Sequence, residues 1–233
     1  MDYSPLIMAL VIIFMLFLPM IIGKILTFII TIYYRNHRYN VSNYKYTAKE
    51  VLDEYIYKHH LSTQVRLRKG FLTDCYNVDT DYIYLSESVY NHRSLLAVSI
   101  ALHEMSHMIL FKNGEWNHRA SAVLSPFNNF FAKALMVSAC FIFIFHWTHP
   151  IFCVIFVISI IIYIVTMISV IQRERLASMH ALLMMKDMEA DLQDIHKANV
   201  LLRCCWLTYL FQFISTLAIV FFFMLGGRID KVK

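Results

Sequence analysis

Two histidines flank a glutamate in the segment His103-Glu104-Met105-Ser106-His107. On a helix, residues at positions i and i+4 project from one face, so both imidazoles can bind one zinc ion. Zinc lowers the pKa of a bound water towards neutrality and polarises a carbonyl group. A glutamate next to the first histidine can take a proton from that water and deliver it to a leaving amine. The segment therefore predicts peptide-bond hydrolysis, with His103 and His107 as zinc ligands and Glu104 as general base.

An alternative interpretation is that these residues occur together by accident on an amphipathic helix. The neighbouring residues argue against it, because Ala101-Leu102 and Met108-Ile109-Leu110 would bury both histidines. A buried imidazole without a partner is costly, and a metal ion is such a partner.

The motif requires a helix, and the sequence supplies both ends of one. Ser94 precedes a run of apolar residues and is a suitable N-cap. We expect the helix to extend through the motif to about Phe111, where Asn113-Gly114 ends it.

The residues before the motif have the pattern of a small mixed domain. Thr47-Ala48-Lys49-Glu50 has the form of a capping box, which predicts a short amphipathic helix ending near His60. Residues 64–67 and 81–85 alternate as strands do, and residues 77–80 have turn chemistry between two pairing segments. A small sheet is therefore expected in front of the motif helix.

Composition places the chain in a lipid bilayer. Of the 233 residues, 59% are hydrophobic and only 16% are charged, which is unlike a soluble domain. Four long apolar runs predict four membrane-spanning helices, at residues 6–34, 130–145, 151–170 and 204–225. The first run has no basic start and is too long for a signal peptide, so we interpret it as a retained anchor.

Charge and cysteine content indicate the side of the membrane and the compartment. Thirteen of the 21 Lys and Arg residues lie in residues 24–133 and five in residues 171–203, which favours the cytoplasm for both segments. Of the five cysteines, only Cys75 lies in the polar region. Because the sequence shows neither a disulfide framework nor a CxxC metal pattern, we expect the soluble part to face a reducing compartment. Outside the membrane flanks, the sequence has no stripe of cations interleaved with aromatic residues, so we do not expect nucleic-acid binding.

A catalytic zinc ion needs a third protein ligand. Glu174 is a candidate, because the apolar hairpin before it returns the chain to the side of the motif. The alternative for Glu174 is an ordinary ion pair with Arg173 or Arg175. Other candidates for the third ligand are His118, Glu115, His180 and Asp187.

Several segments resemble the YugP-type family of neutral zinc metallopeptidases of bacterial membranes. The matching segments, in order and spacing, are residues 72–76, 85–90, 93–95 and 101–107, and the resemblance resumes at 174–182. It implies a zincin-like domain among transmembrane helices, Glu174 as third ligand, and a strand near residues 82–85 as an edge that pairs with an extended substrate.

The chain departs from the family pattern at two positions. Ser106 stands where the family usually has glycine, and Leu176 stands where it usually has an acidic residue. Ser178, one turn after Glu174, could orient a zinc ligand instead. Tyr76 and His180 are candidates for polarising the substrate carbonyl.

The expected fold class is an α-rich membrane protein of α+β type, with about four transmembrane helices and a small zincin-like domain that contains a short β-sheet. We expect a membrane anchor at residues 1–35, the zincin-like domain at 36–126 and a transmembrane hairpin at 127–171. A polar helix at 172–200 would complete the zinc site, and a fourth transmembrane helix would follow at 201–227.

Two functions remain open at this point. One is a zinc endopeptidase of the bacterial plasma membrane that cuts membrane-associated proteins or small peptides. The other is a non-catalytic scaffold or accessory protein with a structural or vestigial metal site, in which His118 would be a fourth ligand. A site-2 type intramembrane protease would need a later Leu-Asp-Gly motif, which the sequence lacks.

Overall fold

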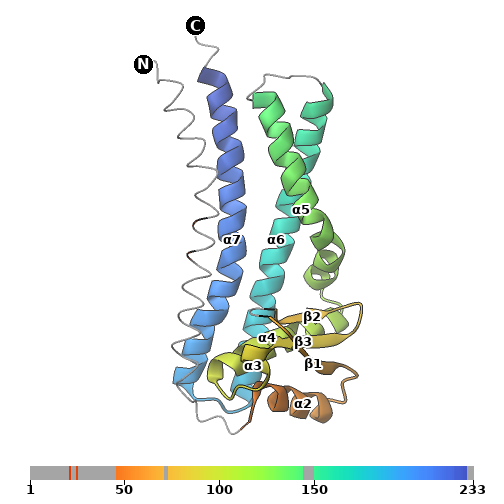
Figure 1. Ribbon diagram of the computed structural model, residues 1–233, viewed down its shortest axis with the longest axis vertical. Helices are drawn as coiled ribbons and strands as arrows, with labels where there is room; N and C mark the ends of the chain where they lie inside the picture. The colour runs from red at the N-terminus through yellow and green to blue at the C-terminus, as the bar shows by residue number, and fades with distance from the viewer. Residues whose placement is uncertain (1–20, 22–24, 26–45, 71–72, 144–149, 230–233) are drawn as a thin grey trace. The chain divides into compact units, whose positions relative to one another are not determined.

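The computed structural model describes residues 21, 25, 46–70, 73–143 and 150–229 (Figure 1). The predicted N-terminal anchor lies outside the described residues, apart from Ile21 and Ile25. The chain forms two compact units. The first unit comprises Met1–Thr27, Val123–Ile171 and Leu207–Lys233, and the second unit comprises Phe28–Ala122 and Gln172–Trp206.

In the second unit, helix α2 (Ala48–Lys58) begins with the predicted capping box. The Thr47 hydroxyl accepts from the Glu50 amide at 3.2 Å, and the Glu50 carboxylate accepts from the Thr47 amide at 2.7 Å. These reciprocal bonds satisfy two amides that a helix start leaves without intrahelical partners.

A three-stranded sheet follows, with strand order β1-β3-β2 (Figure 1). Strand β1 (Gln64–Arg68) runs parallel to β3 (Tyr82–Ser86), and β2 (Cys75–Asn77) runs antiparallel to it. The expected strands are confirmed as β1 and β3, whereas β2 was not predicted. The expectation that β3 is a sheet edge was wrong. Its residues Ile83 and Leu85 are fully buried, and β3 has a partner strand on each side.

The motif helix is α4 (Leu95–Lys112), which follows the short helix α3 (Glu87–Tyr90). As predicted, the Ser94 hydroxyl caps α4 by accepting from the Ala97 amide at 3.1 Å. The helix ends at Asn113-Gly114, where Gly114 has a φ of +83° that favours glycine.

Helix α4 lies in the core of the second unit. Its residues Leu102, Met105 and Met108 are fully buried in one cluster with residues of α2, the sheet and two later helices. This packing surrounds the motif with apolar side chains, as the sequence predicted.

Three long helices complete the described chain: α5 (Trp116–Phe143), α6 (Pro150–Asp187) and α7 (Leu192–Ile229). The residues of the polar helix expected at 172–200 do not form one helix, because they make up the end of α6 and the start of α7. Glu189 adopts a left-handed conformation with φ +58°, and the Ala190 amide bonds back to the Met185 carbonyl at 3.2 Å. This pattern ends a helix without requiring glycine or proline.

Among the described residues, three helices are long and apolar enough to cross a membrane. They are α4, α6 and the part of α7 up to Phe221. The apolar segment Phe130–Ala139 of α5 is shorter. In the first unit, Leu135, Tyr163, Met167 and Val220 form a small buried cluster. Long apolar helices are consistent with a membrane protein, and the number of four spans stays a prediction.

Candidate metal centre

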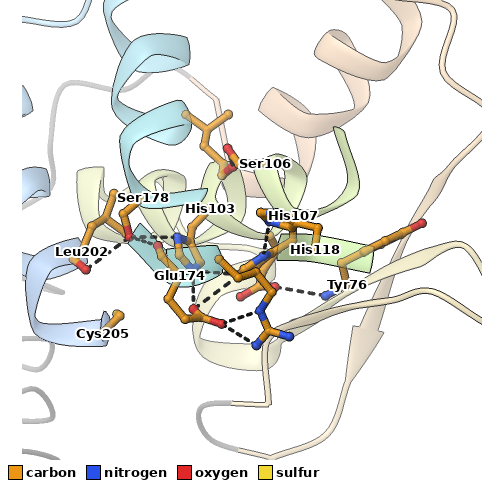
Figure 2. A network of polar contacts seen from close by, with 12 residues as sticks. Tyr76, His103, Ser106, His107, His118, Glu174, Ser178, Leu202 and Cys205 are labelled. Carbon is orange, nitrogen blue, oxygen red and sulfur yellow. Dashed lines mark hydrogen bonds and ion pairs between the residues drawn. The ribbon is translucent and has the colours of Figure 1, made fainter. Parts of the chain in front are cut away.

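Helices α4 and α6 bring His103, His107 and Glu174 together inside the second unit (Figure 2). The two histidine Nε2 atoms lie 3.2 Å apart. Oε2 of Glu174 lies 3.3 Å from Nε2 of His103 and 3.5 Å from Nε2 of His107. His103 and Glu174 are each only 5% exposed. The three side chains form a buried group that could hold a metal ion.

The dimensions of this triangle fit zinc. Zinc is bound tetrahedrally by nitrogen and oxygen at about 2.0–2.1 Å, which separates neighbouring ligand atoms by about 3.3 Å. The three observed separations are 3.2, 3.3 and 3.5 Å. Two imidazoles and one carboxylate are also a ligand set that zinc accepts while leaving one position open.

The second carboxylate oxygen of Glu174 contacts its neighbour in the chain. Nε and Nη2 of Arg173 donate to Oε1 of Glu174 at 3.1 and 2.6 Å. Glu174 was expected to be either a metal ligand or the partner of an arginine, and its geometry allows both. Oε1 pairs with Arg173, while Oε2 faces the histidines. A carboxylate held this way has a fixed orientation towards the cluster.

Ser178 lies behind His103. Its hydroxyl donates to the Glu174 carbonyl at 2.8 Å and lies 3.4 Å from Nδ1 of His103. Because the hydroxyl hydrogen is used by the carbonyl, Nδ1 of His103 donates to the serine oxygen. The lone pair of His103 is then on Nε2, which faces His107 and Glu174.

His118, in the first turn of α5, lies behind His107. Its Nε2 is 3.3 Å from Nδ1 of His107, and the side chain is buried. The pKa of His118 is lowered to about 3, chiefly by burial, with the nearby His107 and Arg173 acting in the same direction. The candidate third ligand His118 therefore contacts the ring nitrogen of His107 that faces away from the cluster.

Glu104 is buried on α4 and reaches the edge strand β2. Its Oε2 accepts a hydrogen bond from the Tyr76 amide at 3.0 Å. The Tyr76 hydroxyl donates to Asp81 at 3.0 Å, and burial together with this bond raises the pKa of Tyr76. Tyr76 therefore meets Glu104 through its backbone, whereas its hydroxyl is engaged by Asp81.

The other predicted candidates lie elsewhere. Nδ1 of His180 is 3.3 Å from the Ser106 hydroxyl, which itself donates to the Leu102 carbonyl at 2.7 Å. Glu115 and Asp187 are exposed. Among the residues that the structure describes, the three-residue metal group contains none of these side chains.

Two aspartates beside the strands make hydrogen bonds that hold the sheet in place. Burial raises the pKa of Asp74, which accepts from the Ser86 amide at 2.7 Å. Burial would also raise the pKa of Asp81, but hydrogen bonds from Lys112, Thr63 and Tyr76 outweigh it, and the pKa is lowered. The bond from Lys112 joins the end of α4 to the turn between β2 and β3.

Comparison with protein families agrees with the geometry. A family model described as "Putative neutral zinc metallopeptidase" matches residues 9–226. Neither a curated protein nor a solved structure matches the chain. The match covers most of the sequence, so the chain belongs to this metallopeptidase family, and the resemblance seen in the motif segments is confirmed.

Proposed function

We propose that this family member is a membrane-embedded zinc endopeptidase. His103, His107 and Glu174 would hold the zinc ion, and Glu104 would act as general base. The observation that carries the proposal is the buried triangle of ligand atoms with sides of 3.2 to 3.5 Å, which directly adjoins Glu104 in the chain. Ligands and base are thus positioned by two helices of one packed unit.

Zinc, when bound, would supply a Lewis acid that polarises the scissile carbonyl and makes a water molecule more acidic. The Glu104 carboxylate takes the proton and returns it to the leaving amine. The hydrogen bond from the Tyr76 amide to Oε2 of Glu104 fixes the orientation of this carboxylate.

The substrate would lie along β2. Tyr76 is paired opposite Ile83 of β3, yet its amide is directed at Glu104. An extended peptide that adds to this edge of the sheet by backbone hydrogen bonds would pass the general base. The proposal therefore assigns to β2 the role that the sequence resemblance suggested for β3.

The position of Glu174 in the sequence favours substrates close to the lipid surface. It follows the apolar residues 151–171 of α6 after only two residues. We propose that the enzyme cuts membrane-associated proteins or small peptides at the cytoplasmic face of the bacterial plasma membrane. The excess of cations in residues 24–133 supports this side.

Replacement of Glu104 by glutamine tests the proposal. Glutamine keeps the shape of the side chain but cannot accept the proton, so Glu104→Gln should bind zinc as the wild type does and lose cleavage by at least about 100-fold. Zinc content of the purified full chain and peptide cleavage in liposomes are the measurements. Glu115→Gln, which changes an exposed glutamate outside the metal group, is the matched control.

Membrane proteomics of cells carrying either form would identify the substrates, because uncleaved proteins should accumulate with Glu104→Gln. Equal cleavage by wild type and variant would remove Glu104 from the mechanism. Zinc bound by both forms, with no protein processed by either, would instead support a non-catalytic scaffold with a structural metal site.

A further inference from the structure

The two ring nitrogens of His107 face different partners. Nε2 lies 3.2 Å from Nε2 of His103 and 3.5 Å from Oε2 of Glu174, whereas Nδ1 lies 3.3 Å from Nε2 of His118 (Figure 2). A neutral imidazole has one protonated nitrogen and one lone pair. If Nε2 is to bind a metal ion, the proton must be on Nδ1, and a buried N–H needs an acceptor.

We infer that His118 is a positioning residue that holds His107 in its metal-binding tautomer, an inference that rests on the proposed zinc site. Nε2 of His118 accepts the Nδ1–H of His107. This bond fixes both the tautomer and the orientation of the His107 ring, as outer partners of metal-bound histidines do.

The local chain path explains why residue 118 lies beside residue 107. Helix α4 ends at Lys112, and Gly114 adopts a φ of +83° that lets the chain reverse into α5. A Cβ atom at Gly114 would lie 3.2 Å from the Arg119 guanidinium, so the turn is also tight. The His118 amide bonds to the Glu115 carbonyl at 3.1 Å, which places the histidine in the first turn of α5.

Burial makes His118 an effective acceptor. Only 3% of its surface is exposed, so water does not replace it as partner of His107. The two proposed ligands are thus held by different groups, since Nδ1 of His103 meets the Ser178 hydroxyl and Nδ1 of His107 meets an imidazole. Both partners are neutral acceptors, and neither draws the proton away from the ligand imidazole.

Zinc affinity is the direct test, measured on the purified full chain by competition with a coloured chelator. His118→Leu removes the acceptor and should weaken zinc binding by about 10–100-fold, the usual effect of losing an outer partner. His118→Gln should restore most of the affinity, because the glutamine oxygen reaches the position of Nε2. His118→Asn, whose oxygen stands nearer the backbone, should not.

His180→Leu is the matched control. It removes a histidine of α6 that hydrogen-bonds to Ser106 of α4 without touching the metal group, so it should leave zinc affinity unchanged. The absorption spectrum of bound Co²⁺ gives a second readout, and it should change with His118→Leu alone among these two leucine variants.

Wild-type zinc affinity in His118→Leu would overturn the inference. If that variant does not fold, the glutamine and asparagine forms decide the question, and equal zinc affinity of the two would overturn it as well. If the wild type binds zinc but cleaves no substrate, only the proposed enzymatic function is contradicted. The role of His118 would then stand on the affinity data.

Discussion

Helices α4 and α6 are both long and apolar enough to cross a membrane, yet their side chains have different surroundings. In the most apolar stretch of 18 residues in α4, 67% of the stretch is buried within the protein. In the corresponding stretch of α6, only 22% is buried. The exposed apolar side chains in residues 151–168 of α6 are Ile151, Val154, Ile155, Val157, Ile158, Ile161, Val165 and Ile168. So many exposed apolar side chains on one helix are consistent with a helix that crosses a membrane.

The difference shows that high hydropathy predicts a helix shielded from water, but not whether protein or lipid covers it. The apolar residues of α4 are covered by α2, α3, the sheet and the second-unit parts of α6 and α7. This protein environment can also supply hydrogen-bond partners to polar side chains, which lipid cannot. Helix α4 can therefore hold two histidines and a glutamate in an apolar setting.

A photoactivated probe dissolved in the bilayer gives the largest expected contrast. Residues 151–168 of α6 should be labelled, and residues 95–112 of α4 should not, because protein covers them. Mass spectrometry of the digested protein locates the label. Equal labelling of the two helices would show that α4 also faces lipid, and the comparison would fail.

Truncation of one apolar side chain on each helix, buried in α4 and exposed in α6, gives the next contrast. Leu102 is fully buried in α4, so Leu102→Ala should reduce the free energy of unfolding by about 2–5 kcal/mol. Ile158 on α6 is 49% exposed, and Ile158→Ala should change it by less than about 0.5 kcal/mol. Thermal unfolding in detergent compares the two variants, and similar losses would contradict different surroundings.

Metal removal should affect the unit that contains α4. A ligand that binds only the folded state, present at about 100 times its dissociation constant, stabilises that state by about 2.7 kcal/mol. Chelation should therefore lower the unfolding temperature of the wild type, and zinc should restore it. In His107→Ala the addition of zinc should have little effect. An equal zinc response in the variant would place the metal elsewhere.

The fold was predictable where the determining contacts are local. The caps at Thr47 and Ser94 depend on hydrogen bonds to residues three positions later, and the sequence shows both. The central position of β3 depends on two partner strands, one of which has only three residues and no alternating pattern. The break near Glu189 was missed because no glycine or proline marks it.

In the candidate site, too, the residues set by local spacing were easier to predict than those set by distant contacts. His103 and His107 follow from spacing on one helix, whereas Glu174 is 71 residues from His103 and needed the apolar hairpin and the family resemblance. The contact of His118 with His107 could not be predicted, because it depends on how sharply the chain turns at Gly114. Sequence indicated that His118 could approach the metal, but not which nitrogen it would meet.

Acid should weaken the contacts at the end of α4 but not those of residues 150–171 of α6. The lowered pKa of Asp81 means that its ion pair with Lys112 stabilises the fold above about pH 3.9, the unfolded value, and that this contribution is lost as the pH falls through the lower folded value. The pair is about one-third exposed, so the effect should be only about 0.2–1 kcal/mol.

Asp81→Asn isolates this charge, because asparagine also tolerates the φ of +54° at that position. The variant should have a lower unfolding temperature at pH 7 and a smaller further decrease towards pH 3 than the wild type. Asp79→Asn, an exposed change in the same turn, is the control. Since residues 150–171 of α6 contain no charged side chain, a matching acid response in α6 would mean that the two helices unfold as one unit.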